Sequence, residues 1–276
     1  GEGERVFFQI VEAYPKRVWD DIPGISFLDG NGIFVNNPKG DRLKEIDQIP
    51  SPYLEGTFAP LMDANPNENW IVLWETNRGC PFACTFCDWG SAVNSKVFFW
   101  DLKRLEAEID WFSENKIGYV FCCDANFGIT PRDVDLCRYT ASNKERFGYP
   151  KKLSFQNTKN ATERSYLTQK IMVDAGLANG IALALQSNDP ETLKAIKRSN
   201  ISLKSYEELQ HRFVKDGVPS YSDLIIGMPN ETYESFTNGV SKTIKGGQHN
   251  RIIFANCQIL PNAEMGDPEY QAEYGM

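Results

Sequence analysis

Three cysteines gather in one short stretch that could hold a metal ion or a metal cluster. Cys80, Cys84 and Cys87 form a C-x3-C-x2-C array, so three of the seven cysteines fall within eight positions. Thiolates are soft ligands that favour zinc or iron–sulfur clusters. Three outcomes are open: a zinc site completed by a fourth ligand, a four-iron cluster with one iron left open, or unrelated core cysteines.

The rest of the chain favours the four-iron cluster over zinc. A structural zinc site takes four protein ligands, usually as two pairs. No second C-x2-C pair follows the array, and the only two histidines, His211 and His249, lie far along the chain. A four-iron cluster normally takes four cysteines. A cluster on three cysteines would therefore keep one iron free to bind another molecule.

Composition and charge narrow the functional class. The formal net charge of the 276 residues is -8, which does not indicate nucleic acid or an anionic membrane as partner. No apolar run approaches the roughly 20 residues that span a bilayer, and the first residues do not resemble a signal peptide. The odd, clustered cysteines favour reduced thiols. We therefore expect a cytoplasmic protein.

An alternation of strand-like and helix-like segments is predicted to position the cysteines. The expected strands are 71–75, 118–124, 152–157, 180–186, 220–226 and 251–258, and the expected helices are 101–114, 131–147, 163–175, 190–197 with 203–216, and 233–246. Strands joined through helices run parallel with right-handed crossovers. The pattern predicts an α/β fold, a partial (βα)6 TIM-like barrel, with an open doubly wound sheet as the alternative. Both place function at the carboxyl ends of the strands, where the cysteine array follows the first strand.

The residues around the array resemble a known family. The stretch E-T-N-R-G-C-P-F-A-C-T-F-C-D-W-G, with Phe86 just before the third cysteine, resembles the cluster loop of radical S-adenosylmethionine (SAM) enzymes. The resemblance covers residues 70 to about 260 and is greatest to members that carry an N-terminal cobalamin-binding domain. Those members share a GEGE-type segment, a hairpin and a P-S-P-Y linker, which match residues 1–69.

The resemblance implies a division of the chain. Residues 1–69 would form a helix, a hairpin at 24–35 and a linker after a missing cobalamin-type domain. Residues 70–262 would form the radical SAM partial barrel, and residues 263–276 would begin a truncated C-terminal extension. Cobalamin would then be bound by a domain absent from this chain.

The resemblance also implies cofactors, chemistry and partners. A [4Fe-4S] cluster on the three cysteines would chelate SAM and cleave it reductively to a 5′-deoxyadenosyl radical. The full-length protein would then be a candidate cobalamin-dependent methyltransferase. Its partners would be an electron donor such as flavodoxin or ferredoxin and a small-molecule or peptide substrate. The competing class is a non-catalytic iron–sulfur or zinc protein that carries electrons or stabilises a fold.

Three further segments at predicted strand ends resemble the family's SAM-binding motifs. The predicted cofactor contacts are Asp124 and Asn126 after the second strand, Gln186, Ser187 and Arg198 after the fourth, and Ile225 in the fifth, together with Phe86 in the loop. Each has a structural alternative. The first segment could be a plain turn with Asn and Gly, the second a helix cap, and Ile225 a core residue.

Overall fold

The computed structural model describes residues 3–16, 18–89, 96–159 and 162–276, and it contains two compact units, Gly1–Pro50 and Ser51–Met276. The first unit holds α1 (Gly3–Ala13), the antiparallel hairpin of β1 (Ser26–Leu28) and β2 (Phe34–Asn36), and the short 3-10 helix η1 (Ile46–Gln48). The predicted helix and hairpin are both present. The Asp29 carboxylate accepts hydrogen bonds from the backbone N–H groups of Asn31 and Ile33 and so fixes the hairpin turn.

The second unit carries the strand and helix alternation. Its strands are β3 (Ile71–Trp74), β4 (Asn77–Arg78), β5 (Phe98–Phe99), β6 (Tyr119–Cys122), β7 (Lys152–Ser154), β8 (Ile181–Ala182), β9 (Ser220–Ile226) and β10 (Arg251–Asn256). Its helices are α2 (Ala59–Ala64), α4 (Leu102–Glu114), α5 (Pro131–Phe147), α6 (Thr162–Asp174), α7 (Pro190–Ala195), α8 (Leu203–Lys215), α9 (Tyr233–Lys245), the 3-10 helix η2 (Glu264–Gly266) and α10 (Pro268–Tyr274).

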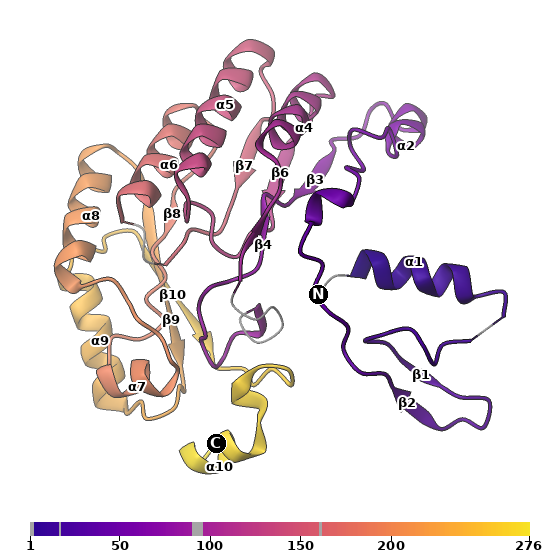
Figure 1. Ribbon diagram of the computed structural model, residues 1–276. Coiled ribbons are helices and arrows are strands. Elements are labelled where there is room, and N and C mark those ends of the chain that lie inside the picture. Colours follow the sequence, from indigo (N-terminus) through magenta and orange to yellow (C-terminus); the bar gives the residue numbers. More distant parts are fainter. Residues whose placement is uncertain (1–2, 17, 90–95, 160–161) are drawn as a thin grey trace. The chain divides into compact units, whose positions relative to one another are not determined.

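The six main strands are parallel, as predicted. They form two three-stranded sheets, in the orders β3-β6-β7 and β8-β9-β10, and all four pairings within them are parallel. Helices α4, α5, α6, α8 and α9 lie along the outer side of this curved array (Figure 1). The described part of the chain therefore has the predicted α/β architecture of a partial barrel.

Alternation along the strands decides which side chains meet the helices. In β3, Val72 and Trp74 are buried while Ile71 and Leu73 are exposed. The Trp74 indole N–H donates to the Glu108 carboxylate of α4 at 2.8 Å, so the buried ring keeps its polar group paired. Successive side chains of a strand point to opposite faces, which places Ile71 and Leu73 on the inner side of the array.

Two features differ from the sequence expectation. Residues 51–69, expected as linker, contain α2, and the Tyr53 side chain is buried against Trp111 and Phe112 of α4 at ring-centroid distances of 5.3 and 5.0 Å. The antiparallel pair of β4 and β5 was not predicted at all, because strands of two residues carry no detectable periodicity. This pair flanks the segment that holds the cysteines.

No helix in the described ranges is long and apolar enough to cross a membrane.

Candidate functional site

The cysteine segment leaves the barrel at the carboxyl end of β3 and is fixed there by a buried carboxylate. Asp124, which follows β6, accepts hydrogen bonds from the backbone N–H groups of Thr76 and Asn77 at 2.8 and 3.2 Å. It also accepts from the Asn77 side-chain amide at 2.8 Å and from the Thr76 hydroxyl. The first residues of the cysteine segment are therefore tied to the neighbouring strand.

Asp124 is almost fully buried, and burial raises its pKa to about 6. The hydrogen bonds from Thr76 and Asn77 act in the opposite direction and keep the shift from being larger. Both carboxylate oxygens are engaged within the loop. The geometry thus gives Asp124 a role in positioning the cysteine segment, and its predicted contact with SAM stays a prediction.

Two nitrogen donors point at the cysteine sulfurs. The side-chain amide of Asn126 donates to Cys80 Sγ at 3.2 Å, and Lys159 Nζ donates to Cys84 Sγ at 3.2 Å. Cys80 and Cys84 are only 4% and 5% exposed, while Cys87 is more accessible. Hydrogen bonds to sulfur stabilise negative charge on a metal-binding thiolate and tune the potential of an iron–sulfur cluster. The surroundings of the two buried cysteines therefore suit thiolate ligands.

A second cation, Arg198, lies beside Cys84 and Cys87. Arg198 is 5% exposed and donates from Nε to Asn200 Oδ1 at 2.8 Å and from Nη2 to the Ala184 carbonyl. Burial lowers its pKa, while Cys84 and Cys87 act against that shift. Its third nitrogen, Nη1, is buried and has no hydrogen-bond partner among the described residues. That nitrogen is a ready donor to an anionic ligand.

The donors beside the cysteines suit the sulfur ligands of an iron–sulfur cluster. Within the described ranges, no three His, Cys, Asp or Glu side chains converge on a point that could hold one ion. A mononuclear zinc site needs such convergence. A four-iron cluster binds each thiolate through a different iron, so its cysteines stand apart. The Asn126 amide and the Lys159 ammonium group suit the sulfur ligands of such a cluster.

Phe86 and Ile225, both predicted SAM contacts, come together on one apolar surface. They pack against a buried cluster made of Ile196, Met228, Met265 and Tyr270. The cluster joins the cysteine segment to β9 and to the C-terminal helix α10. The structural alternative for Ile225, core packing, therefore holds in part, and the same surface offers an apolar face for a flat ring.

Residues 186–189 follow β8 and are held in an unusual turn. Gln186 has a positive φ of 68° and forms an isolated bridge with Leu224 of the next strand. Ser187 donates from its hydroxyl to Glu231 at 2.6 Å, and burial raises the pKa of that carboxyl group. The second oxygen of Glu231 is buried without a partner in the described chain. Asp189 caps α7 by accepting a hydrogen bond from the Thr192 N–H group. The helix cap considered as the alternative role of this segment is therefore present.

Several residues of this site were not predicted from the sequence. Lys159 follows β7 at the same strand edge, so the rule that ligands gather there could have found it. Glu231 lies five residues after the end of β9, at the same strand edge. The hydroxyl groups of Thr85 and Tyr270 lie 3.0 Å apart. No local sequence pattern could indicate this contact, because it joins residues 185 positions apart.

Comparison with known proteins places the chain in a family. A model of the radical SAM superfamily matches residues 74–238. The chain is 38% identical over its whole length to a 2-(S-pantetheinyl)-carbapenam-3-carboxylate methyltransferase from Streptantibioticus cattleyicolor, and 37% identical to the cobalamin-dependent radical SAM methyltransferase TokK from Streptomyces tokunonensis. It spans about two fifths of these relatives, 41% of each.

A solved structure shares the fold. The radical SAM methyltransferase TsrM from Kitasatospora setae, solved with tryptophan and a SAM analogue, superposes with a TM-score of 0.70 at 16% identity, over 96% of this chain and 52% of TsrM. At this identity the likeness establishes the fold alone. Together with the family model, the cysteine array and the partial barrel, it confirms the resemblance seen in the sequence, and the chain belongs to the radical SAM superfamily, whose cofactors are a [4Fe-4S] cluster and SAM.

Proposed function

We propose that Cys80, Cys84 and Cys87 bind a [4Fe-4S] cluster and that the chain cleaves SAM reductively. When bound, the cluster supplies one electron, which breaks the bond between sulfur and C5′ of SAM to give methionine and a 5′-deoxyadenosyl radical. The observation that carries this proposal is the pair of donors aimed at two buried cysteines, Asn126 at Cys80 and Lys159 at Cys84.

The unpartnered polar atoms near the cysteines complement the amino-acid end of SAM. Asn126 Oδ1 is a buried acceptor without a partner, and Arg198 Nη1 is a buried donor without one, both judged among the described residues. Leaving such groups unpaired costs about 1–3 kcal/mol each. An ammonium group bound to Asn126 and a carboxylate bound to Arg198 would satisfy both atoms. We propose these two contacts for the methionine moiety.

We assign the nucleoside end of SAM to the carboxyl ends of β8 and β9. Phe86 and Ile225 share one apolar cluster and would flank adenine. Ser187 and Glu231, which are hydrogen-bonded to each other, would receive the ribose hydroxyl groups, with Gln186 as the neighbouring polar residue. Asp124 supports these contacts indirectly by fixing Thr76 and Asn77 at the base of the loop.

The finer activity is proposed from the relatives. Because both carbapenam-related and cobalamin-dependent methyltransferases match the whole chain, we propose methyl transfer for the full-length protein, with cobalamin bound by a domain outside these 276 residues. A pantetheinyl-substituted carbapenam carboxylate is the first substrate to test. Flavodoxin or ferredoxin is the proposed electron donor, and the cytoplasm the proposed compartment.

Product analysis tests the proposal. Protein reconstituted anaerobically and reduced with dithionite should convert SAM to 5′-deoxyadenosine and methionine, and Cys84→Ala should abolish the conversion. Arg198→Met should raise the KM for SAM at least tenfold because it removes a charged hydrogen bond to the carboxylate. Equal product formation by the wild-type protein and Cys84→Ala would refute the proposal.

A further inference from the structure

The segment that joins α7 to α8 contacts the cysteine segment and also carries Arg198. The Ile196 carbonyl in this segment accepts a hydrogen bond from the backbone N–H group of Thr85 at 3.1 Å. Arg198 itself lies beside Cys84 and Cys87. The way in which this segment is held therefore decides where Arg198 stands relative to the cysteines.

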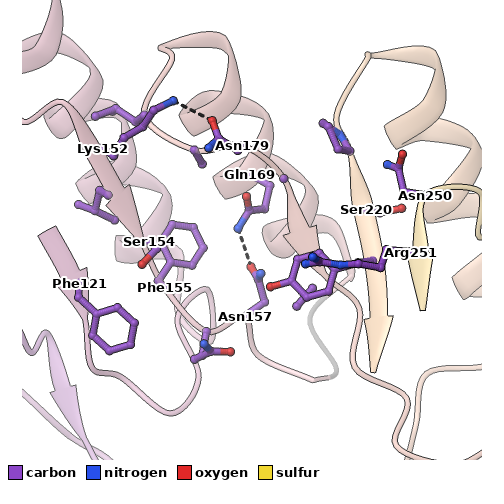
Figure 2. A pocket seen from close by; sticks show the side chains of 18 of the residues that line it. Phe121, Lys152, Ser154, Phe155, Asn157, Gln169, Asn179, Ser220, Asn250 and Arg251 are labelled. Atoms are coloured by element: carbon purple, nitrogen blue, oxygen red, sulfur yellow. Dashed lines mark hydrogen bonds between the residues drawn. The ribbon is translucent and has the colours of Figure 1, made fainter. Parts of the chain in front are cut away.

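The turn after β8 has a neighbouring strand on one side alone, within the described part of the chain. β8 pairs with β9, whereas no pairing joins it to β7. A cavity of about 510 Å³ lies at this gap, with Ser154 of β7 and Ser220 of β9 among its lining residues (Figure 2). A strand edge without a neighbour presents backbone N–H and C=O groups. The carbonyl groups at the end of β8 therefore need donors from elsewhere.

Asn200, a half-buried residue between α7 and α8, supplies two of these donors. Its side-chain amide donates to the carbonyl groups of Leu185 at 2.9 Å and Ser187 at 2.8 Å. These carbonyl groups flank Gln186, whose φ of 68° is a conformation that residues other than glycine rarely adopt. Strained backbone of this kind persists only where its surroundings hold it. The two hydrogen bonds from Asn200 therefore hold the turn.

The same amide group orients Arg198. The oxygen of Asn200, Oδ1, accepts a hydrogen bond from Arg198 Nε at 2.8 Å, and Arg198 Nη2 donates to the Ala184 carbonyl. An asparagine side chain offers two N–H donors and one carbonyl acceptor, and Asn200 uses both kinds. Because Nε and Nη2 are bound, the guanidinium plane is fixed. Among the described residues Nη1 has no partner, so it is the nitrogen left for a ligand.

We infer that Asn200 is a positioning residue that couples the two ends of the SAM site. Its oxygen orients Arg198, the proposed partner of the SAM carboxylate. Its nitrogen holds the turn that presents Gln186 and Ser187 to the ribose. Asn200 acts through these residues and not through SAM itself. This role rests on the proposed function, whereas the three hydrogen bonds of Asn200 do not.

Two ligands separate the contributions of the two ends. SAM and decarboxylated SAM share the nucleoside, the sulfonium and the amino group, but only SAM carries the carboxylate. Equilibrium dialysis of the reconstituted protein should give the lower Kd for SAM. Asn200→Ala should raise both Kd values and reduce the preference for SAM about tenfold, because a loosely held Arg198 loses a charged hydrogen bond. In an Arg198→Met background, Asn200→Ala should cause no further loss of preference.

Asn188→Ala is the matched control for these measurements. Asn188 lies in the same turn, and its side-chain amide donates to the Gly239 carbonyl at 3.0 Å and to the Thr243 hydroxyl at 2.8 Å, both in α9. This variant removes two hydrogen bonds from the turn and none from Arg198, so the preference for SAM should stay as in wild type. A preference unchanged by Asn200→Ala, or reduced equally by both variants, would overturn the proposal.

Hydrogen exchange tests the contacts of Asn200 without the cluster or SAM. In the cluster-free protein, the backbone amides of residues 183–189 should exchange several-fold faster in Asn200→Ala than in wild type. Asn200→Asp, which keeps the acceptor for Arg198 but loses both donors, should give the same result. Asn143→Ala, which removes a hydrogen bond to Asp110 between α5 and α4, should leave these amides unchanged.

The outcomes distinguish the positioning role from the proposed function. Exchange at the wild-type rate in both Asn200 variants would overturn the positioning role, even if the protein binds SAM. A wild-type protein that assembles a cluster but binds no SAM would refute the proposed function. The exchange rates would still decide whether Asn200 holds the turn after β8.

Discussion

The hydroxyl group of Tyr270 lies 3.0 Å from the hydroxyl of Thr85 and donates to the Ala195 carbonyl at 3.1 Å. Thr85 stands between the second and third cysteines of the array. Its backbone N–H bonds to Ile196 and its carbonyl accepts from Met265 N–H at 2.8 Å. The C-terminal segment therefore holds the cysteine segment in place, which gives residues 263–276 a structural role inside the second unit.

Tyr270→Phe should loosen the cysteine segment. The change removes two buried hydrogen bonds while keeping the ring, and we expect it to lower the free energy of unfolding by about 1 kcal/mol. We also expect a chelator to extract iron from the reconstituted protein several-fold faster. Tyr274→Phe is the matched control, because its ring packs against Tyr270 at 4.6 Å but its hydroxyl is exposed. Equal extraction rates for the two variants would contradict the assigned contact.

Gly79→Ala should displace Cys80. Gly79 has φ +124°, and a Cβ there would press against the backbone carbonyl oxygen of Lys96. Strain of this kind costs on the order of 1–3 kcal/mol. We expect lower thermal stability and a lower iron content after reconstitution. Gly56→Ala serves as control, since Gly56 also has a positive φ but nothing lies within 4 Å of the added carbon. The prediction fails if both variants retain the same iron content.

The raised pKa of Asp124 predicts that the free energy of unfolding depends on pH. Its folded-state pKa of about 6 lies above the ordinary value of 3.8, so the folded protein holds the proton more tightly than the unfolded chain. The protonated Asp124 therefore makes its full contribution to the free energy of unfolding below about pH 4. This contribution is lost as the pH rises through 6. The loss amounts to about 3 kcal/mol. Urea unfolding of the cluster-free protein should show wild type losing this amount relative to Asp124→Asn between pH 4 and 7. If the free energies of unfolding of wild type and Asp124→Asn change with pH in parallel, the raised pKa of Asp124 is ruled out.

Lys159→Met should lower the reduction potential of the reconstituted cluster. Lys159 donates to Cys84 Sγ at 3.2 Å, and removing its charge disfavours the more negative reduced state. We expect a shift of about 60 mV to more negative values, which corresponds to a tenfold change for one electron. Lys170→Met on α6, whose lysine pairs with Asp174, is the control. A redox titration followed by electron paramagnetic resonance checks both, and identical potentials would contradict the contact.

Local patterns were sufficient to predict the barrel. The alternation of short strand-like runs with longer helical segments was visible in the sequence. The structure adds the ends of α5, where Thr130 and Asp133 form a capping box and Gly148 ends the helix with φ 75°. The gap between β7 and β8 could not be predicted, because periodicity indicates strands but not which of them pair. Gln186, which was expected to extend the strand, instead adopts a positive φ.

The structure places Asn126 beside Cys80 and Arg198 beside Cys84 and Cys87, so these residues lie near the cysteine segment, and their binding roles stay predictions. The position of Asp124 was predicted, but its binding of Thr76 and Asn77 depends on side-chain geometry. The contact of Tyr270 with Thr85 could not be predicted, because a contact between a loop and a terminal helix leaves no local sequence pattern.

The most direct test is the electron paramagnetic resonance spectrum of the reduced, reconstituted protein with and without SAM. We expect about four irons per chain, a reduced-cluster signal that changes when SAM is added, and no such signal in a variant with Cys80, Cys84 and Cys87 all changed to Ala. A cluster whose spectrum is indifferent to SAM, or iron retained by the triple variant, would contradict the assignment of these cysteines and of an open iron that binds SAM.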